Sequence, residues 1–428
     1  MLVKRRLNIG KENKIPPSLM AVMLVCIYLS DALLFTYNSN LVLSSIIPQY
    51  GLVVLAIVYL SLDIQRMLER VDKGFGMMVL VCCMLLIESV IHDEIRGGYV
   101  SKISLFVLGY CLFDFYPQEK LIEAFKKWMV IICLGSLVGL VLGGFIVNLN
   151  FLPTITSIIG RKFYFLFLTN VPSYDFIRNY GPFTEPSRFQ AFIWLALVFE
   201  LFNYKKDTCI NKKRILIYVL TIISTFSATS YIAVGFVFVA YITSNKSSLS
   251  FGGRTILLII LSAIVILLVN FSSGVNIAIT KFQLGEESES FAVRVNSIIG
   301  GIRVALNNPI FGTGFGNYQS EYMYAISDLA TSRSHVSTNT MILYFSKFGF
   351  LVGLYYAFNV FSMLKSFTGK HTTILLFVGF FFCVSGISLL DSIFFTAIIY
   401  YRRSVTNDLF FLKENRQYEE IASKEHKK

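Results

Sequence analysis

Long apolar runs separated by short polar stretches dominate the chain from residue 19 to residue 401. As helices, such runs can cross the roughly 30 Å of hydrocarbon in a bilayer. A membrane β-barrel would instead show alternating segments of about ten residues. The pattern therefore predicts an all-α, polytopic integral membrane protein with about twelve transmembrane helices. We expect them at 19–37, 41–62, 74–91, 99–115, 128–148, 189–203, 215–226, 229–243, 255–272, 348–364, 372–386 and 388–401.

Two longer apolar stretches, 215–243 and 372–401, are each interpreted as two crossings because of the charges at their ends. Lysine or arginine residues precede and follow both stretches, and these residues favour the cytoplasmic side. Small and hydroxyl-bearing residues at 227–230, and Gly386, provide the breaks. The resulting topology places both termini in the cytoplasm and two long loops, 149–188 and 273–347, on the outer face.

Composition agrees with this membrane topology. The 428 residues are 55% hydrophobic and 15% charged, and the mean hydropathy is +0.64. The net charge of +12 is spread over short loops and termini, so it indicates inner-leaflet anchoring to membrane lipids rather than nucleic-acid binding. None of the seven cysteines lies in a long outer loop, and their spacing matches no disulfide or metal pattern, so we expect no metal.

The two outer loops carry arginines where the charge rule predicts few. Because positive charge usually stays on the cytoplasmic side, these arginines indicate a function there. A guanidinium group is well suited to gripping phosphate through paired hydrogen bonds. The residues are Arg161, Arg178, Arg188, Arg294, Arg303 and Arg333.

The first outer loop contains the sequence RNYGPFTEPSRF at 178–189. Its Gly-Pro and Glu-Pro pairs predict turns that bring Arg178, Glu185 and Arg188 together. One carboxylate cannot neutralise two arginines, which favours a ligand at Arg178. For Glu185 a structural ion pair and a functional role remain equally open, and Arg188 at a membrane boundary can also snorkel to phospholipid.

The second outer loop begins with a predicted helix over 291–307. Arg294 and Arg303 are nine residues apart in it, so they point to roughly opposite faces, and only one faces a common site readily. Arg294 lies on the more polar side, and we interpret Arg303 as interfacial.

The sequence NNPIFGTGFGNY follows at 307–318. Gly312 and Gly314 resemble part of a phosphate-binding loop, but no strand precedes them and no lysine follows. We therefore favour a tight turn that packs beneath a site, although its amides can still face an anion.

The end of this loop reads RSHVSTN at 333–339. His335 is the only histidine in either long outer loop, and it lies beside Arg333 and Asn339. A single histidine is more often structural, but this position favours a catalytic role. Without a second histidine, a cysteine or a carboxylate pair, it does not indicate a metal site.

Several charged residues lie inside or at the ends of the apolar runs. Intramembrane charge is costly and often functional. Lys102, Asp114 and Glu200 lie near helix ends, where snorkelling explains them. Asp31, Glu88 and Asp391 lie deeper, where a proton or substrate path and a structural role are both open.

These loops together resemble the bacterial O-antigen and capsular polysaccharide polymerases, whose relatives are the O-antigen ligases. The resemblance is carried by the sequence RNYGPFTEP and by the second-loop sequences FAVR, NNPIFGTGFGNY and SHVSTNTMILYFSKFGFLVGLYYAF. It implies a multi-pass glycosyltransferase of the cytoplasmic membrane that uses undecaprenyl-diphosphate-linked glycans at the outer face. The family often has Asn directly after its histidine, whereas this chain has Val336, with Asn339 further on.

The resemblance also implies roles for particular residues. Arg178 and Arg294 would stabilise the diphosphate leaving group, and His335 would accept the acceptor proton, with Glu185 as the reserve base. Arg188, Arg303, Arg333, Gly312, Gly314 and Asn339 are further substrate-binding candidates. No cofactor is needed, and a chain-length regulator and a flippase are implied partners. A ligase acting on another acceptor lipid, and a glycan or lipid transporter, remain alternatives.

Overall fold

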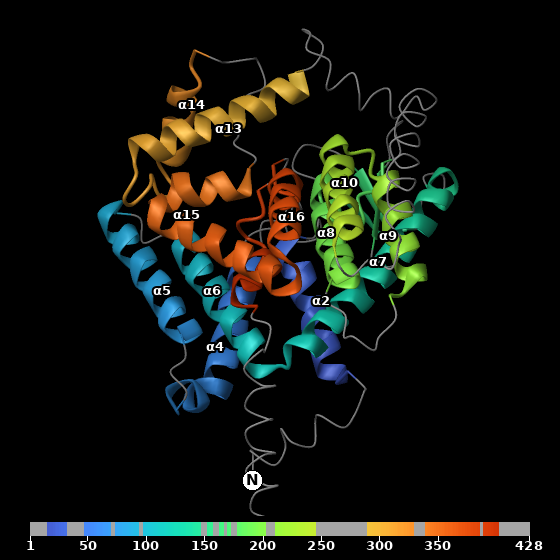
Figure 1. Ribbon diagram of the computed structural model, residues 1–428, viewed down its shortest axis with the longest axis horizontal. Helices are drawn as coiled ribbons and strands as arrows, with labels where there is room; N and C mark the ends of the chain where they lie inside the picture. Colours follow the sequence, from blue (N-terminus) through green and yellow to red (C-terminus); the bar gives the residue numbers. More distant parts are fainter. Residues whose placement is uncertain are drawn as a thin grey trace, which may run out of the picture.

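The computed structural model describes most of the chain. The described residues are 15–31, 47–69, 73–93, 97–146, 152–156, 162–166, 169–172, 178–202, 210–244, 289–328, 339–385 and 388–401. The protein is mostly helical, as predicted, and Figure 1 shows its helices gathered in one bundle. The predicted span over 255–272 lies outside the described residues.

The first half of the bundle follows the predicted runs closely. Its helices are long because apolar residues continue through several turns without an internal proline. They are α2 (Pro17–Asp31), α4 (Ile47–Glu69), α5 (Lys73–Ile91), α6 (Gly97–Phe115), α7 (Gln118–Ile146) and α8 (Pro186–Phe202). The second half contains α9 (Lys212–Ser224), α10 (Ala228–Thr243), α13 (Glu289–Asn307), α14 (Tyr318–Ala325), α15 (Thr340–Phe367), α16 (Lys370–Cys383), α17 (Ile393–Ala397) and the 3₁₀ turn η2 (Ile398–Tyr400).

Four of the described helices are long and apolar enough to cross a membrane. They comprise residues Gly74–Ile91, Gly98–Phe115, Gln118–Gly143 and Thr340–Phe367. Shorter apolar helices lie at Pro17–Leu29, Tyr50–Leu62, Tyr231–Thr243 and His371–Cys383. Together they define a multi-pass membrane protein, while twelve crossings and the orientation of the termini stay predictions.

Helix α5 shows how the bundle meets lipid. Leu85 is fully buried against neighbouring helices. Val90, on the opposite side, is 72% exposed, and Leu80, Leu86 and Ile87 are also exposed. A soluble protein would leave this apolar stripe in water, whereas a bilayer covers it.

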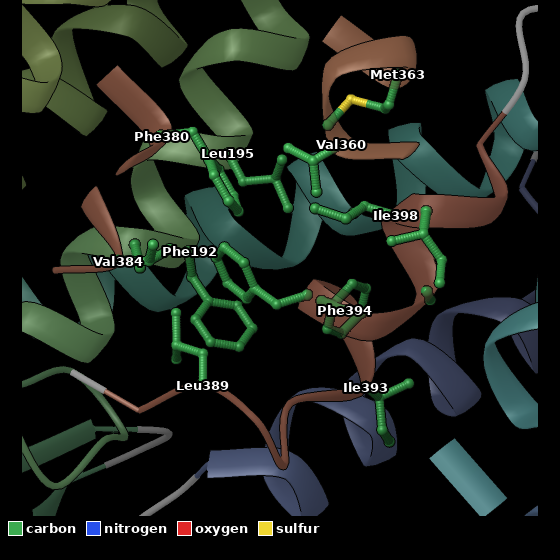
Figure 2. Close-up of a cluster of buried hydrophobic side chains, with 14 of the residues drawn as sticks. Phe192, Leu195, Val360, Met363, Phe380, Val384, Leu389, Ile393, Phe394 and Ile398 are labelled. Atoms are coloured by element: carbon green, nitrogen blue, oxygen red, sulfur yellow. The ribbon is translucent and has the colours of Figure 1, made fainter. Parts of the chain in front are cut away.

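Helix α8 lies in the middle of the bundle. Nearly every residue of α8 is buried, from Phe189 to Phe202. Figure 2 shows Phe192 and Leu195 packed with side chains from α15, α16 and the segment of α17 and η2. Phe192 lies edge-to-face with Phe395, with ring centroids 5.4 Å apart. This core fixes the first turn of α8, where part of the candidate site lies.

The predicted break in the stretch 215–243 is confirmed. Helix α9 ends at Ser224 and α10 begins at Ala228. Between them Phe226 adopts a positive φ of 47°. This conformation is strained for a residue with a side chain, so the surrounding contacts must hold the turn.

The predicted helix over 388–401 is wrong as a continuous helix. After α16, the chain forms a turn at Leu390 and Asp391, then only the short α17 and η2. Lys102 of α6 donates to the carbonyl of Leu390, and Arg188 donates to the carbonyl of Ser388 at 3.2 Å. These hydrogen bonds satisfy carbonyls that a helix would use internally.

Two other boundaries differ from the prediction. Helix α7 begins at Gln118, ten residues before the predicted run 128–148, because the carbonyl of Pro117 accepts from the Lys120 and Leu121 amides and so starts the helix. Helix α15 begins at Thr340, inside the predicted outer loop, because Asn339 caps it by accepting from the Ile342 amide at 3.1 Å.

The first outer loop contains a small sheet that an all-α fold did not predict. Strands β1 (Thr154–Thr156), β2 (Lys162–Leu166) and β3 (Thr169–Pro172) pair antiparallel in the order β1-β2-β3. Tyr164 faces Thr154 on one side and Val171 on the other. β-Branched and aromatic residues fit these short strands, but the segment is too short to give a clear alternating pattern.

The charged residues inside the apolar runs have different surroundings. Glu200 lies 3.1 Å from Lys126 and 3.5 Å from Arg214, in a network shared with Glu123. Lys102 is fully buried, and its ammonium lies 3.7 Å from a carboxylate oxygen of Asp391. Within the described part of the chain, both carboxylate oxygens of buried Glu88 lack a hydrogen-bond partner. The side chain of Asp31 lies outside the described residues.

Candidate functional site

Arg178 is held by the turn between α9 and α10. Its Nε donates to the carbonyl of Thr225 at 3.1 Å, and its Nη2 donates to the carbonyl of Phe226 at 2.7 Å. A helix break leaves carbonyls without intrahelical donors, so this turn needs such a partner. The guanidinium is thereby oriented from one side and remains only half-buried.

Asn179 anchors the segment that carries Arg178. Its side-chain Nδ2 donates to Ser136 of α7 at 3.0 Å and to Ser224 of α9 at 2.9 Å. Its Oδ1 accepts from the Gly181 amide at 3.1 Å and closes a tight turn. These three bonds fix the backbone next to Arg178 independently of the guanidinium.

Gly181 lies at the tightest point of this loop. Its φ is +54°, and an added Cβ would lie 2.8 Å from the ring of Phe189. Its carbonyl accepts from the Asn170 amide at 2.7 Å, which ties the loop to β3. Only glycine fits both requirements.

Arg294 of α13 comes close to Arg178 and Glu185. Burial lowers the pKa of Arg294, the positive charge of Arg178 lowers it further, and the Glu185 carboxylate raises it. Both guanidinium groups keep their charge at neutral pH. The charges of Arg178 and Glu185 therefore both act on Arg294, and a bound anion would relieve the repulsion between the two cations.

Glu185 lies at the entrance to α8. It is exposed, its carbonyl accepts from the Arg188 amide at 3.1 Å, and Pro186 follows as the first helical residue. Its carboxylate accepts from the hydroxyl of Ser187 at 3.3 Å. The charge of Glu185 thus acts on Arg294, whereas the Arg188 guanidinium reaches the carbonyl of Ser388.

The glycine-rich turn packs on α15. The amide of Thr313 donates to Ser346 and that of Gly314 donates to Lys347, each at 3.0 Å. The Gly312 amide donates to Asn308 at 3.1 Å. In this conformation these amides serve backbone carbonyls rather than an anion, as expected for a turn that packs beneath the site.

Helix α15 receives this turn at a kink. Gly349 has a φ of 76° inside α15, and an added Cβ would lie 2.1 Å from the Ile310 carbonyl oxygen. The Phe350 amide, which the kink frees, donates to Pro309 at 2.7 Å. The kink and the turn therefore fit each other as one unit.

Arg303 lies away from the two clustered arginines. It makes a two-pronged ion pair with Asp328, with N–O distances of 2.6 and 3.1 Å. The hydrogen bond to Arg303 lowers the pKa of Asp328, and the same bond raises the pKa of Arg303. As expected for helix positions nine residues apart, Arg294 and Arg303 have different surroundings.

The remaining candidates lie at the start of α15. Asn339 is fully buried as its N-cap. Arg333 and His335 lie outside the described residues, as does Arg161. Among the residues that the structure describes, no group of three or more His, Cys, Asp or Glu side chains lies together as metal ligands.

Two contributors to this site have only weak signals in the sequence. Asn179 follows Arg178 in a turn-forming stretch, which suggests a local hydrogen bond but not its partners on α7 and α9. Phe226 carries no turn signature; the break was indicated by the basic residues at the ends of 215–243 and by the small and hydroxyl-bearing residues at 227–230. Both act through contacts between distant segments.

The apolar helices define a multi-pass membrane protein. Residues 215–357 match the family model described as O-antigen ligase, which confirms the predicted resemblance to the O-antigen ligase and polymerase family. The match includes Arg294, the glycine-rich turn and His335, and it ends before α15 does. No curated protein and no solved structure matches the chain.

Proposed function

We propose that this protein is a glycosyltransferase that joins oligosaccharide repeat units carried on undecaprenyl diphosphate at the outer face of the cytoplasmic membrane. The observation that carries the proposal is that Arg178 and Glu185, from a distant loop, lie close enough to Arg294 for their charges to shift its pKa. The family match supports a polymerase or ligase type of role in O-antigen assembly. The product is an O-antigen, a capsule or an exopolysaccharide.

The reaction is a displacement at the anomeric carbon of the donor glycan. A hydroxyl oxygen of the acceptor repeat unit forms the new bond, and the bond between that carbon and the diphosphate breaks. The diphosphate leaves with the bonding electrons, so negative charge develops on it. Arg178 and Arg294 stabilise this charge, and direct displacement inverts the anomeric centre.

The acceptor hydroxyl loses its proton in the same step. His335 accepts that proton, because the unperturbed pKa of an imidazole suits proton transfer near neutral pH. Glu185 is the alternative base, since its exposed carboxylate lies near the arginines. The two guanidinium groups supply the charge that a magnesium ion supplies elsewhere, so neither a metal nor a cofactor is required.

Some residues around the site support its backbone, and others would contact the substrate. The glycine-rich turn with Gly312 and Gly314 supports α15, and Asn339 caps that helix near His335 in the sequence. Arg188 and Arg333 would contact the lipid-linked substrate or phospholipid headgroups. A flippase that delivers the repeat units and a chain-length regulator are the partners that such a polymerase requires.

A ligase is the second candidate, because the matching family model carries that description. A ligase uses the same donor chemistry and differs only in its acceptor, a distinct lipid-linked saccharide. Purified protein offered repeat units alone would lengthen them as a polymerase and leave them unchanged as a ligase. Adding the second acceptor would then restore transfer only in the ligase.

The test of the chemistry is turnover of purified lipid-linked repeat units, followed as glycan length on gels. His335→Ala should lower the rate by about a hundredfold to ten-thousandfold if the imidazole is the base. His335→Gln keeps hydrogen bonding but cannot accept the proton at neutral pH. Wild-type turnover in His335→Gln would disprove the base assignment and leave Glu185 to be tested next.

A further inference from the structure

A groove lies between α13 and α14, separate from the paired arginines. It has a volume of about 370 Å³, and its walls include Arg303, Leu306, Asn307, Tyr324 and Asp328. Figure 1 shows α13 and α14 side by side at one end of the bundle, beyond the first part of α15. The groove therefore opens on the end of the protein that carries the second long loop.

The polar wall of the groove is an ion pair that is already neutral. Arg303 grips both carboxylate oxygens of Asp328, and its Nη1 also donates to the Ala325 carbonyl at 2.7 Å. Such a pair presents fixed donors and acceptors side by side with little net charge. It differs from Arg178 and Arg294, whose positive charges act on each other and favour an anion.

The apolar wall of the groove is unusually open. Tyr324 is 77% exposed and Leu306 is 62% exposed, although neither lies in an apolar membrane run. An exposed tyrosine offers a flat apolar ring with a polar tip. A saccharide has the matching surfaces, an apolar C–H face and an edge of hydroxyl groups that both donate and accept hydrogen bonds.

Helices α13 and α14 are packed closely against each other near the groove. An added Cβ at Gly300 would lie 2.3 Å from Ile326 and 2.8 Å from Tyr322, so α13 and α14 approach each other there as closely as glycine allows. Tyr322 and Ile326 are fully buried. A site on two closely packed helices loses little conformational entropy when it binds a ligand.

The size of the groove favours a small ligand over a protein. Small-molecule sites typically have volumes of about 300–1,000 Å³, whereas stable protein interfaces bury about 800 Å² on each partner. Arg303 lies nine residues from Arg294 on α13, which corresponds to ~13.5 Å along a helix that rises 1.5 Å per residue. A short stretch of oligosaccharide spans that distance.

We propose that the α13–α14 groove is a binding site for a neutral saccharide segment of the glycan, with Tyr324 stacking on a sugar ring and the Arg303–Asp328 pair binding its hydroxyl groups. This inference rests on the proposed function, because it takes the glycan as the ligand. Holding the chain here keeps it near the diphosphate site between successive additions. The groove therefore governs how long the product becomes, and not whether one bond forms.

The binding test uses free oligosaccharide repeat units, released by mild acid from the lipid-linked units, and calorimetry on the full-length protein in nanodiscs. Tyr324→Ala and Asp328→Asn should each weaken binding by about tenfold or more. Glu321→Gln on α14 removes a carboxylate that does not line the groove and should bind as the wild type does. Unchanged affinity in both groove variants overturns the proposal.

Exchanging the charges of Arg303 and Asp328 distinguishes an ion pair that only holds the helices together from one that binds the saccharide. The double variant Arg303→Asp with Asp328→Arg restores attraction across the pair but reverses the donors and acceptors that the saccharide meets. We expect normal thermal stability without recovery of oligosaccharide affinity. Recovery of wild-type affinity would show that the pair only holds the helices, and would refute its assigned contact with hydroxyl groups.

Product length gives an independent readout. Tyr324→Ala should shorten the glycans made from lipid-linked units while the rate of the first bond stays within about twofold. An equal loss of product length and of the rate of the first bond would overturn the proposal that the groove holds the glycan chain. If the wild type forms no bond at all yet binds free oligosaccharide through Tyr324, the proposed reaction fails and the saccharide groove stands.

Discussion

The guanidinium of Arg178 donates a 2.7 Å hydrogen bond to the carbonyl oxygen of Phe226, a residue held at a positive φ of 47°. The loop arginine thus caps the break between α9 and α10, and the break positions the arginine. A strained turn persists only when its surroundings hold it. The proposed contact with the diphosphate and the local backbone geometry would therefore be linked at one side chain.

Arg178→Gln and Arg294→Gln should each abolish most glycan polymerisation. Glutamine keeps an amide donor but loses the charge that stabilises the leaving diphosphate, and one such donor is typically worth about a hundredfold to a thousandfold in rate. Asn179 still anchors the loop, so the Arg178 variant should accumulate in membranes. Turnover of purified lipid-linked units measures the effect, with Lys213→Gln on exposed α9 surface as the charge control. Near-normal turnover in both arginine variants would exclude them as ligands of the diphosphate.

Gly349→Ala should destabilise the protein. Alanine would have to adopt φ 76° and ψ 176°, a conformation almost restricted to glycine that costs roughly 1–3 kcal/mol, and its methyl group would meet the Ile310 carbonyl. Gly235→Ala in α10 is the matched control, because no atom lies within 4 Å of its added Cβ. Thermal unfolding in detergent should show a lower midpoint for Gly349→Ala alone. Equal midpoints would mean that the turn and the kink do not depend on each other.

Glu200→Gln should be more damaging than Glu123→Gln. The Glu200 side chain is 6% exposed and faces Lys126 and Arg214, whereas that of Glu123 is 34% exposed. Removing one partner of a buried ion network costs roughly 3–5 kcal/mol, because the remaining charge has lost its compensation. Thermal unfolding of both variants and of the wild type makes the comparison. A larger effect at Glu123 would show that the network is governed by its exposed members.

Cysteine labelling can establish the orientation of the bundle. In a cysteine-free background, a membrane-impermeant reagent added to intact cells should modify Ser320→Cys on exposed α14. It should not modify Asn211→Cys, which lies just before α9 and is expected in the cytoplasm. Permeabilised cells provide the control in which both positions react. Modification of position 211 in intact cells would contradict the predicted topology.

The pattern of apolar residues along the chain was sufficient to predict most of the described helices. An apolar run specifies a membrane helix because each backbone group must be satisfied within the run itself. That reasoning placed α5, α6 and α10 near their observed bounds, and basic flanking residues indicated the break before α10. It failed over 388–401, where Lys102 and Arg188 bind carbonyls and replace helical hydrogen bonds from outside the segment.

The sequence also singled out candidate arginines, because guanidinium groups in loops predicted to be outside contradict the usual charge distribution. It could not show that Arg178 rests on the turn at Phe226, nor that Arg303 is neutralised by Asp328. These pairings join residues 48 and 25 positions apart. Helix periodicity predicted that Arg294 and Arg303 face different ways, but which distant segments meet each of them depends on the packing of whole helices, so only the tertiary structure showed their partners.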